Sequence, residues 1–264
     1  MTTALFDAAA KDYDDIFTNS KIGKLQRSSV WNYLESILPY DGINILELNC
    51  GTGEDAVWLG KKGHHVLATD VSEKMVEITS SKVISQDLSG FVSARVLDIN
   101  EIDKISPVQK FDLVFSNFGG LNCLNENELK ILSKNLKNLL NPDGRFIAVV
   151  MPDFCMIESI YYLLKLRFDQ FLRRKKKQNV KIGDANIDTY YYGYKTFSKI
   201  FDEDFYKNNV VGIGMFVPPS YLNNFFDNKN GILKFLGMME NIFAKYTFSA
   251  LMSDHYLIDL VLKK

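Results

Sequence analysis

Between residues 43 and 151, short apolar runs typical of β-strands alternate with segments whose apolar residues have the spacing of a helix. Three segments have helical spacing, and Gly63 and Ser72 are predicted to end the first and cap the second. Strands joined through single helices form βαβ units, so the pattern predicts an α/β fold with a mostly parallel sheet. The strand runs are 43–48, 64–70, 91–99, 111–118 and 145–151, and the helical segments are 54–62, 72–84 and 126–140.

After residue 151 the chain changes to longer apolar and aromatic stretches. The first of these, at 154–178, ends in five consecutive basic residues at 173–177. Such a run is usually a solvated helix end favoured by the helix dipole; the alternative is an anionic partner such as a carrier protein, a membrane surface or a phosphorylated substrate. The expected elements are helices over 154–178, within 190–201 and over 231–248, and strands within 208–222 and over 255–264.

Polar residues follow four of the predicted strands. The glycine-bearing loop Glu47–Gly53 follows the first strand, and Asp70, Asp98 and Asn117 end or follow the next three. Ligands of open α/β sheets bind beyond the carboxyl ends of the strands, so these residues should gather at one edge. A single acid after a strand is ordinarily a cap, but four positions in register predict a binding site.

Two ligands fit this loop. Residues 51–56, GTGEDA, match the G-x-G-x-x-A pattern of dinucleotide-binding proteins, and Asp70 lies at a suitable spacing for a ribose hydroxyl. A pyrophosphate, however, prefers a helix start without anions, and here Glu47, Glu54 and Asp55 are close in sequence. These carboxylates favour a cationic ligand that carries an adenosine, such as S-adenosylmethionine with its ammonium and sulfonium groups.

Residues 43–151 resemble the class I S-adenosylmethionine-dependent methyltransferases. LELNCGTG (46–53), ATDVSEKMVEI (68–78) and VLDI (96–99) are similar to the first three motifs of that family. Asn49 replaces the first loop glycine, and asparagine tolerates positive φ better than most residues. The resemblance implies a Rossmann-like, mostly parallel seven-stranded sheet with an antiparallel last strand, helices on both faces and a helical cap.

The resemblance also assigns cofactor-binding roles by position. Glu47 would face the ammonium of S-adenosylmethionine, Asp70 would bind the ribose hydroxyls, and Asp98 with Ile99 would hold the adenine edge. Residues 119–122 would form a flexible edge of the substrate pocket. The other candidates are the loop residues Asn49, Cys50, Gly51 and Gly53, the adenine neighbours Val71 and Met75, and Asn117 with Phe118 near the transferable methyl group.

The N-terminal residues 6–17, FDAAAKDYDDIF, resemble the opening of many small-molecule and lipid-precursor methyltransferases, where this segment covers the cofactor. Tyr13 and Phe6 are candidates for that lid. Arg27 could pair with the methionine carboxylate, although a solvated helix arginine is the commoner case. We expect an N-terminal helical lid over 1–40 and a methyltransferase domain over 41–264, whose cap insertions near 154–205 and 217–250 line an apolar acceptor pocket.

The composition of the chain limits the classes of partner and the cell compartment that we expect. A net charge of −1 provides no basic field for nucleic acid. Cys50, Cys123 and Cys155 have no C-x-x-C spacing, which favours a reducing compartment. No signal peptide and no apolar run long enough for a membrane span is recognisable. The sequence therefore predicts a cytoplasmic protein with a small-molecule substrate, no nucleic-acid partner and no bound metal.

The implied reaction is methyl transfer to a small, apolar or carrier-bound acceptor, at oxygen, carbon or nitrogen. No general base stands out: His64 and His65 begin the second strand, at the wrong end of the sheet, and His255 begins the last strand, which favours a structural role. SNFGG at 116–120 stands where Asn-Pro-Pro-Tyr enzymes carry their motif, which argues against methylation of DNA adenine or glutamine. The alternatives are a non-catalytic adenosyl-ligand-binding protein or partner subunit with the same fold and, more distantly, a NAD-linked oxidoreductase.

Overall fold

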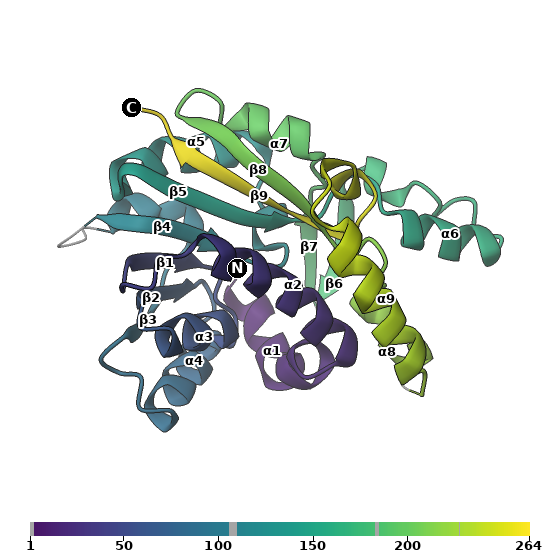
Figure 1. Cartoon of the computed structure of the whole chain (residues 1–264), viewed down its shortest axis with the longest axis horizontal. Coiled ribbons are helices and arrows are strands. Elements are labelled where there is room, and N and C mark those ends of the chain that lie inside the picture. The colour runs from purple at the N-terminus through teal and green to yellow at the C-terminus, as the bar shows by residue number, and fades with distance from the viewer. Residues whose placement is uncertain (1–2, 106–109, 183–184, 227) are drawn as a thin grey trace.

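A twisted seven-stranded sheet forms the centre of the computed structural model, which describes residues 3–105, 110–182, 185–226 and 228–264 (Figure 1). The strand order is β3-β2-β1-β4-β5-β9-β8. β1 to β5 are parallel, whereas β9 runs antiparallel to both of its neighbours. This confirms the predicted Rossmann-like sheet with an antiparallel last strand. The strands are β1 (Asn44–Leu48), β2 (His65–Asp70), β3 (Val92–Val96), β4 (Phe111–Ser116), β5 (Leu140–Val150), β8 (Phe205–Ile213) and β9 (His255–Leu262).

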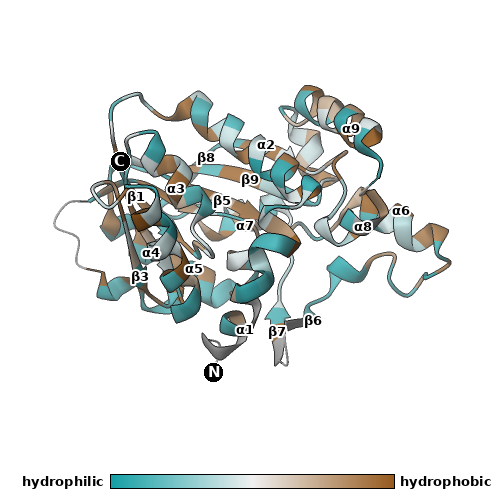
Figure 2. Ribbon diagram, turned by 90° about the horizontal axis from the view of Figure 1, so that it is seen from below, coloured by the Kyte–Doolittle hydropathy of each residue, from teal (hydrophilic) through white to brown (hydrophobic). Residues whose placement is uncertain are grey.

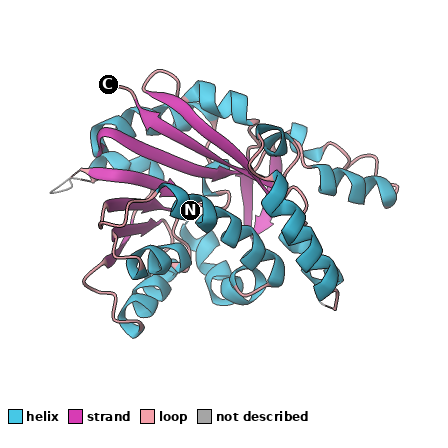
Figure 3. Cartoon of the chain, viewed as in Figure 1, coloured by secondary structure: helices cyan, strands magenta, loops and turns pink. Residues whose placement is uncertain are grey.

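Helices cover both faces of the sheet, as Figure 3 shows. α2, α3 and α4 pack on one face, and α5 and α7 pack on the other. β1 shows why both faces are covered. Ile45 packs with apolar residues of α2, α3 and α4, whereas the next residue, Leu46, packs with those of α5 and α7. The helices are α1 (Thr3–Tyr13), α2 (Lys21–Ile37), α3 (Glu54–Lys61), α4 (Glu73–Ser85), α5 (Glu126–Leu139), α6 (Met156–Leu164), α7 (Tyr194–Ile200), α8 (Asn223–Phe226) and α9 (Asn230–Phe243).

Short polar side chains fix where these helices begin. Ser72 accepts a hydrogen bond from Met75 N and caps α4, as the sequence predicts. Asn125 and Glu128 form a capping box at the start of α5. Gly63 has a φ of +88° just beyond α3, which confirms its predicted role at that helix end. The βα connections are therefore well defined at the carboxyl edge of the sheet.

The prediction of one helix over 154–178 is wrong. α6 ends at Leu164 because the chain turns back: Leu166 N donates to Leu163 O, Arg167 N donates to Tyr162 O, and Leu166 has a φ of +55°. This hydrogen-bond pattern usually has glycine at the left-handed position. Beyond the turn lie the short helix η4 (Arg173–Lys175) and a separate two-stranded sheet of β6 (Gln178–Ile182) and β7 (Ala185–Thr189).

The second cap segment is helical, as predicted, but in shorter pieces. It consists of η5 (Ser220–Leu222), α8, α9 and η6 (Thr247–Leu251). Figures 1 and 2 place α6, α8 and α9 together at one end of the molecule. Contacts join these pieces, because the rings of Tyr161 and Tyr221 lie 6.5 Å apart and Met156 N donates to Met252 O at 2.9 Å. No helix in the described residues is long and apolar enough to cross a membrane.

The first and last parts of the chain are tied to each other. Tyr33 on α2 donates its hydroxyl to Asp259 on β9 at 2.8 Å. Gln26, also on α2, donates to Asp254 at 3.1 Å and to Pro218 O at 3.3 Å. Ahead of α2 lies η1 (Asp14–Thr18), a π-helical turn that continues from α1. These contacts hold the N-terminal helices over the carboxyl edge of the sheet.

Candidate functional site

The residues that follow β1 to β4 meet at the carboxyl edge, as the sequence predicts. The loop after β1 contains three residues in the left-handed region, Asn49, Gly51 and Gly53, with φ values of +48°, +54° and +78°. A Cβ on Gly53 would come within 2.5 Å of the Thr79 side chain, so only glycine fits against α4. Gly51 N donates to Asp70 Oδ2 at 2.9 Å, which joins the ends of β1 and β2.

Asn49, the departure from the family motif, has a structural role. Its Nδ2 donates to Asn117 O at 2.8 Å, and its Oδ1 accepts from Ser116 Oγ at 2.6 Å. The side chain therefore bridges the ends of β1 and β4. It fills the space beside Gly120, where a Cβ would lie 2.2 Å from Asn49 Cγ. Asparagine thus replaces a glycine here without disrupting the turn.

The acids after β2 and β3 are positioned differently. Asp70 is buried and accepts from Ser72 N through Oδ1, in addition to its bond with Gly51, and burial raises its pKa. Asp98 is half-buried and caps η2 (Ile99–Lys104) by accepting from Asn100 N at 2.9 Å. Both carboxylates lie where parallel strands end, at the same edge as the loop after β1.

A carboxylate that the sequence-based site omits organises the N-terminal helices. Asp55, in the first turn of α3, accepts from Arg27 Nη1 at 2.6 Å, from Trp31 Nε1 at 2.6 Å and from Asn117 Nδ2 at 2.9 Å. Arg27 is therefore a buried ion-paired residue and not a solvated helix arginine. Its Nε has no hydrogen-bond partner among the described residues. No spacing in the sequence indicates this cluster, because it depends on contacts between α2 and α3.

Glu47 is the most isolated acid of the site. It is 1 % exposed, and its Oε2 lacks a hydrogen-bond partner in the described part of the chain. Burial, and then the neighbouring charge of Asp55, raise the pKa of Glu47 well above its usual value, although Arg27 opposes this. A buried carboxylate oxygen without a donor is suited to a cationic group.

The N-terminal segment lies over the loop after β1. A Cβ on Gly51 would lie 3.8 Å from Tyr13 Cε1. Burial raises the pKa of Tyr13 to about 12, so its hydroxyl stays protonated. Phe17 packs edge-on against Phe118 with ring centroids 4.9 Å apart, and Thr52 Oγ1 donates to Asp14 Oδ1 at 2.6 Å. Tyr13 therefore lies against the loop after β1, and Phe17 packs between Tyr13 and Phe118.

The remaining candidates are mostly buried. Met75 is 3 % exposed on α4, and Cys50 is packed with its Sγ 3.8 Å from Thr79 Oγ1. Val71 and Ile99 are half-buried beside the ends of β2 and β3. Residues 119–122 are not the flexible edge that was expected. Asn122 lies in η3 (Gly120–Cys123) and is fully buried, with bonds to the backbone of Met151 and Tyr190.

His255 begins β9, and it lies at the same edge of the sheet as the acids that follow β1 to β3, while its structural role stays a prediction. β9 is antiparallel and pairs Tyr256 with Val150, so the start of β9 lies beside the carboxyl end of β5. The imidazole packs edge-on against Phe118 at 5.5 Å, and its Nδ1 lies 3.2 Å from Asp254 Oδ2. The antiparallel direction of β9, which the resemblance implies, brings its first residue to this edge.

The basic run 173–177 is largely paired and not a solvated helix end. Arg173 and Arg174 both donate to Glu158, and Arg174 also donates to Asp254 Oδ1 at 2.6 Å. Lys175 pairs with Asp153 and Lys177 with Asp188. Burial alone would raise the pKa of Glu158, but Arg173 and Arg174 hold this pKa below its usual value.

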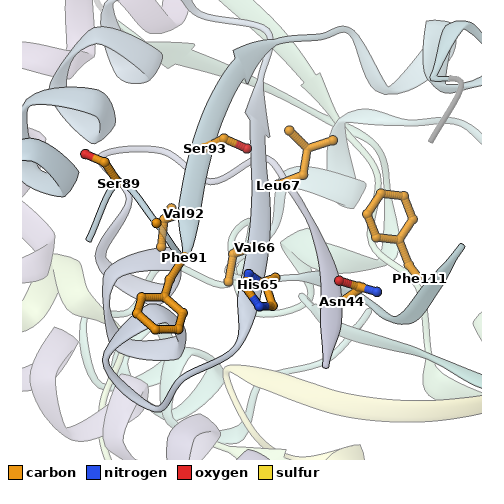
Figure 4. Close-up of a pocket in the computed structure, with 10 residues that line it drawn as sticks. Asn44, His65, Val66, Leu67, Ser89, Phe91, Val92, Ser93 and Phe111 are labelled. Atoms are coloured by element: carbon orange, nitrogen blue, oxygen red, sulfur yellow. The ribbon is translucent and has the colours of Figure 1, made fainter. Parts of the chain in front are cut away.

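A hollow of about 410 Å³ lies at the opposite edge of the sheet, where β1 to β4 begin (Figure 4). It contains His65, which confirms the prediction that this histidine is at the wrong end. It is remote from the acids described above, and no group of metal ligands occurs among the described residues. Its lining residues are Asn44, His65, Val66, Leu67, Ser89, Gly90, Phe91, Val92, Ser93 and Phe111.

Comparisons with known proteins relate this chain to methyltransferases. Residues 45–144 match the family model described as a methyltransferase domain. Demethylmenaquinone methyltransferase of Clavibacter sepedonicus is 29 % identical over 192 residues, which are 72 % of each chain. Among solved structures, magnesium protoporphyrin IX methyltransferase of Synechocystis PCC 6803 with bound S-adenosylhomocysteine has a TM-score of 0.64 and is 15 % identical. The match covers 99 % of this chain and 98 % of the other.

A more distant likeness is found in geranyl diphosphate C-methyltransferase of Streptomyces coelicolor A3(2), with a TM-score of 0.56 and 12 % identity. It covers 89 % of this chain and 80 % of the other, and at such identity the likeness concerns the fold. The domain match, the curated relative and the shared fold carry the same conclusion. Residues 45–144 therefore form a methyltransferase domain, and the chain is similar to class I S-adenosylmethionine-dependent methyltransferases in sequence and in fold.

Proposed function

We propose that this enzyme transfers the methyl group to a small apolar or carrier-bound acceptor beneath the cap formed by α6, α8 and α9. The supporting observation is the composition and place of that cap, whose Phe, Tyr and Met residues follow β5 and separate β8 from β9. An apolar pocket gains about 25 cal/mol per Å² of apolar ligand surface covered. The name of the Clavibacter relative, which acts on demethylmenaquinone, agrees with an apolar acceptor.

The residues at the carboxyl edge fit the cofactor that the family uses. Glu47, whose Oε2 has no donor among the described residues, would bind the ammonium group. Asp70 would accept from the ribose hydroxyls through the free lone pairs of its oxygens. Asp98 with Ile99 would hold the adenine edge. Asn49, Cys50, Gly51 and Gly53 would form the loop, Val71 and Met75 would flank the adenine, and Asn117 and Phe118 would lie near the methyl group.

The N-terminal residues 1–40 would act as the lid in this scheme. Tyr13 lies against Gly51, and Arg27 retains a buried Nε that could donate to the methionine carboxylate. The domain over 41–264 would carry the cap insertions 154–205 and 217–250. We place the enzyme in the cytoplasm, because Cys50, Cys123 and Cys155 are free thiols in the structure.

The chemistry follows from positioning. S-adenosylmethionine supplies an electrophilic methyl group on a sulfonium, so the protein has to orient the acceptor in line and exclude water. Phe17 and Phe118 provide an apolar wall beside the N-terminal helices. Asn117 donates to Asp55, and this bond would hold its side chain in place during turnover.

An acceptor hydroxyl or acidic carbon must also lose a proton, and we propose His255 as its base. The imidazole faces Phe118, and Asp254 lies 3.2 Å from Nδ1, which favours a proton there and leaves Nε2 as the acceptor. Asp254 is held in turn by Arg174 and Gln26. We expect His255→Gln to lower kcat by about a hundredfold or more, while S-adenosylhomocysteine binds as it does to the wild type. A kcat that is unchanged in this variant would exclude the role.

The proposed function is tested by transfer of a labelled methyl group from S-adenosylmethionine to fractions of a metabolite and lipid extract. Activity should appear in an apolar fraction and should be lost in Asp70→Asn, which keeps the shape but weakens charge-assisted hydrogen bonds by about 1–2 kcal/mol. Asp103→Asn, an exposed acid on η2, is the matched control. Activity confined to DNA or RNA, falling steeply as salt rises, would contradict the proposal.

A non-catalytic adenosyl-binding protein is the second candidate function. It is favoured by the extensive ion pairing of Arg27 and Asp55, which holds the N-terminal helices on the edge of the sheet. Tight binding of S-adenosylhomocysteine with no methyl transfer to any fraction would support it. Tighter binding of NAD than of S-adenosylhomocysteine in the same calorimeter would contradict both candidates.

A further inference from the structure

α6, α8 and α9 lie together at one end of the molecule (Figure 2). Large apolar side chains of these helices and of the segment after α6 are exposed. Leu164, Leu166 and Phe168 on and after α6 are 78 %, 75 % and 65 % exposed. On the neighbouring helices Phe225, Phe235 and Met238 are 63 %, 55 % and 53 % exposed. We call these six residues, with the lysines named below, the cap surface. Exposed apolar groups at this density mark an interaction surface.

Leu166 shows that this exposure is built into the backbone. It occupies a left-handed conformation, with a φ of +55°, in a turn where glycine is the usual residue. A leucine there is strained and gains nothing from burial, because most of its side chain is in solvent. Strain of this kind persists where a side chain is needed for function. The leucine is therefore suited to contact a partner outside this chain.

Lysines are interleaved with these apolar residues. Lys229 Nζ lies 3.1 Å from the Phe225 ring centroid, and Lys165 and Lys245 lie over Tyr161 and Tyr246 at 5.9 and 5.4 Å. None of the lysines of the cap surface forms an ion pair with an acid in the described ranges. Long side chains of this type rest on apolar groups and keep their charge in water. The lysines of the cap surface are Lys165, Lys176, Lys229, Lys234 and Lys245.

Charge is unevenly divided between the cap and the rest of the chain. Residues 156–178 and 217–252 together contain ten lysines and arginines and four acids, a net charge of +6. Asp153, Asp188 and Asp254 lie outside these ranges but pair with Lys175, Lys177 and Arg174, so the cap with these partners carries +3. The whole chain carries −1, so the remaining residues carry −4. A second copy of this chain would bring the same positive surface against itself, which is unfavourable. Charge complementarity instead selects an anionic and apolar partner.

We propose that the cap surface docks the enzyme on an anionic lipid bilayer. Helices with exposed apolar residues and flanking lysines bind in the plane of a membrane interface, where the apolar groups enter the acyl boundary and the lysines meet lipid phosphates. The residues after α6 would insert first, since Leu164, Leu166 and Phe168 are adjacent and exposed. This docking is independent of the identity of the acceptor and of turnover.

The test is co-sedimentation of the full chain with vesicles. We expect binding to phosphatidylcholine vesicles that contain phosphatidylglycerol, and at least about tenfold weaker binding to phosphatidylcholine alone. The double variant Leu164→Asp with Phe168→Asp should lose binding, and Lys165→Gln with Lys234→Gln should reduce it and its sensitivity to salt. Ile84→Asp and Ile131→Asp are matched controls, because these residues are 71 % and 55 % exposed on α4 and α5.

Each variant is first shown to be folded by its melting temperature and by binding of S-adenosylhomocysteine. Equal loss of vesicle binding in the Ile84 and Ile131 controls would overturn the proposal, as would equal binding to neutral and anionic vesicles. A dimer that the double variant dissolves, with no vesicle binding by the wild type, would assign the surface to a second copy and overturn it. A methyltransferase assay without activity leaves the vesicle result valid, so this proposal and the proposed function fail separately.

Discussion

At the scale of single residues, Glu47 should couple cofactor binding to pH. Burial raises the pKa of this carboxyl in the free protein, whereas the ammonium of S-adenosylmethionine requires the ionised form. Binding should therefore release a proton, and affinity should rise with pH until Glu47 ionises in the free protein. Calorimetry in buffers of different ionisation enthalpy measures that proton directly.

Two variants sharpen this prediction. Glu47→Gln should bind S-adenosylhomocysteine more than about tenfold less tightly, because a charge-assisted contact is replaced by a neutral one. Its affinity should also be flat over the pH range in which the wild type varies. Glu77→Gln, an exposed glutamate on α4, should match the wild type. Proton release that persists in Glu47→Gln would show that another group, such as Asp70, accounts for it.

Residue-scale prediction from the sequence was uneven for a physical reason. Glu47, Asp70, Asp98 and Asn117 were placed correctly because parallel strands end at one edge whatever packs around them. Asp55 was missed, since its role depends on contacts with α2 that no spacing reveals. Whether these side chains bind the cofactor stays a prediction, which the Asp70 and Glu47 variants address.

At the scale of elements, the free energy of unfolding should depend on the contact between Gly120, in the turn after β4, and Asn49. Gly120→Ala would place a Cβ 2.2 Å from Asn49 Cγ, so we expect a loss of about 2 kcal/mol in the free energy of unfolding. Adding Asn49→Gly should recover part of that loss, because the clash disappears. Urea unfolding of both single variants and of the double variant gives the coupling energy.

The matched control for this cycle is Gly90→Ala, since a Cβ on Gly90 meets no atom within 4 Å. It should change stability by less than about 0.5 kcal/mol. Strict additivity of the Gly120 and Asn49 substitutions would contradict the contact described here. Asn49→Gly alone should also be destabilised, because Ser116 Oγ would lose its acceptor.

Elements were predicted well where local chemistry sets their limits. Ser72 and Gly63 mark the boundaries of α4 and α3 as expected. α6 was predicted too long because its end depends on Leu166 adopting a conformation that sequence reading reserves for glycine. The hairpin of β6 and β7 was missed because the basic run beside it was interpreted as the end of that helix, although Arg174 is drawn inward to Glu158 and Asp254.

At the scale of the whole molecule, that buried ion network should set the acid stability of the cap. Burial alone would raise the pKa of Asp254, but the charges of His255 and Arg174 lower it, and the pKa of Glu158 is lowered as well. Acids whose pKa is depressed on folding contribute stability above their ordinary pKa and lose it as the pH falls through the folded value. The contribution should therefore be present at pH 7 and diminish below about pH 4.

Arg174→Met tests this dependence. It should cost about 3–5 kcal/mol of unfolding free energy at neutral pH, because two buried carboxylates lose their partner, and less in acid, where they are protonated. Lys175→Met, which removes an exposed pair with Asp153, should change stability little at either pH. Equal losses for Arg174→Met at both pH values would show that packing and not charge dominates.

The ties between α2 and β9 affect when the molecule can become functional. Tyr33 and Asp259 are 226 residues apart in the chain, and Gln26 and Asp254 are 228 apart. During synthesis, α2 can pack early on β1 and α3, but these two ties form only after β9 has left the ribosome. A nascent chain that already contains the loop Glu47–Gly53 would thus lack these ties, and the emergence of β9 would complete them in one late step.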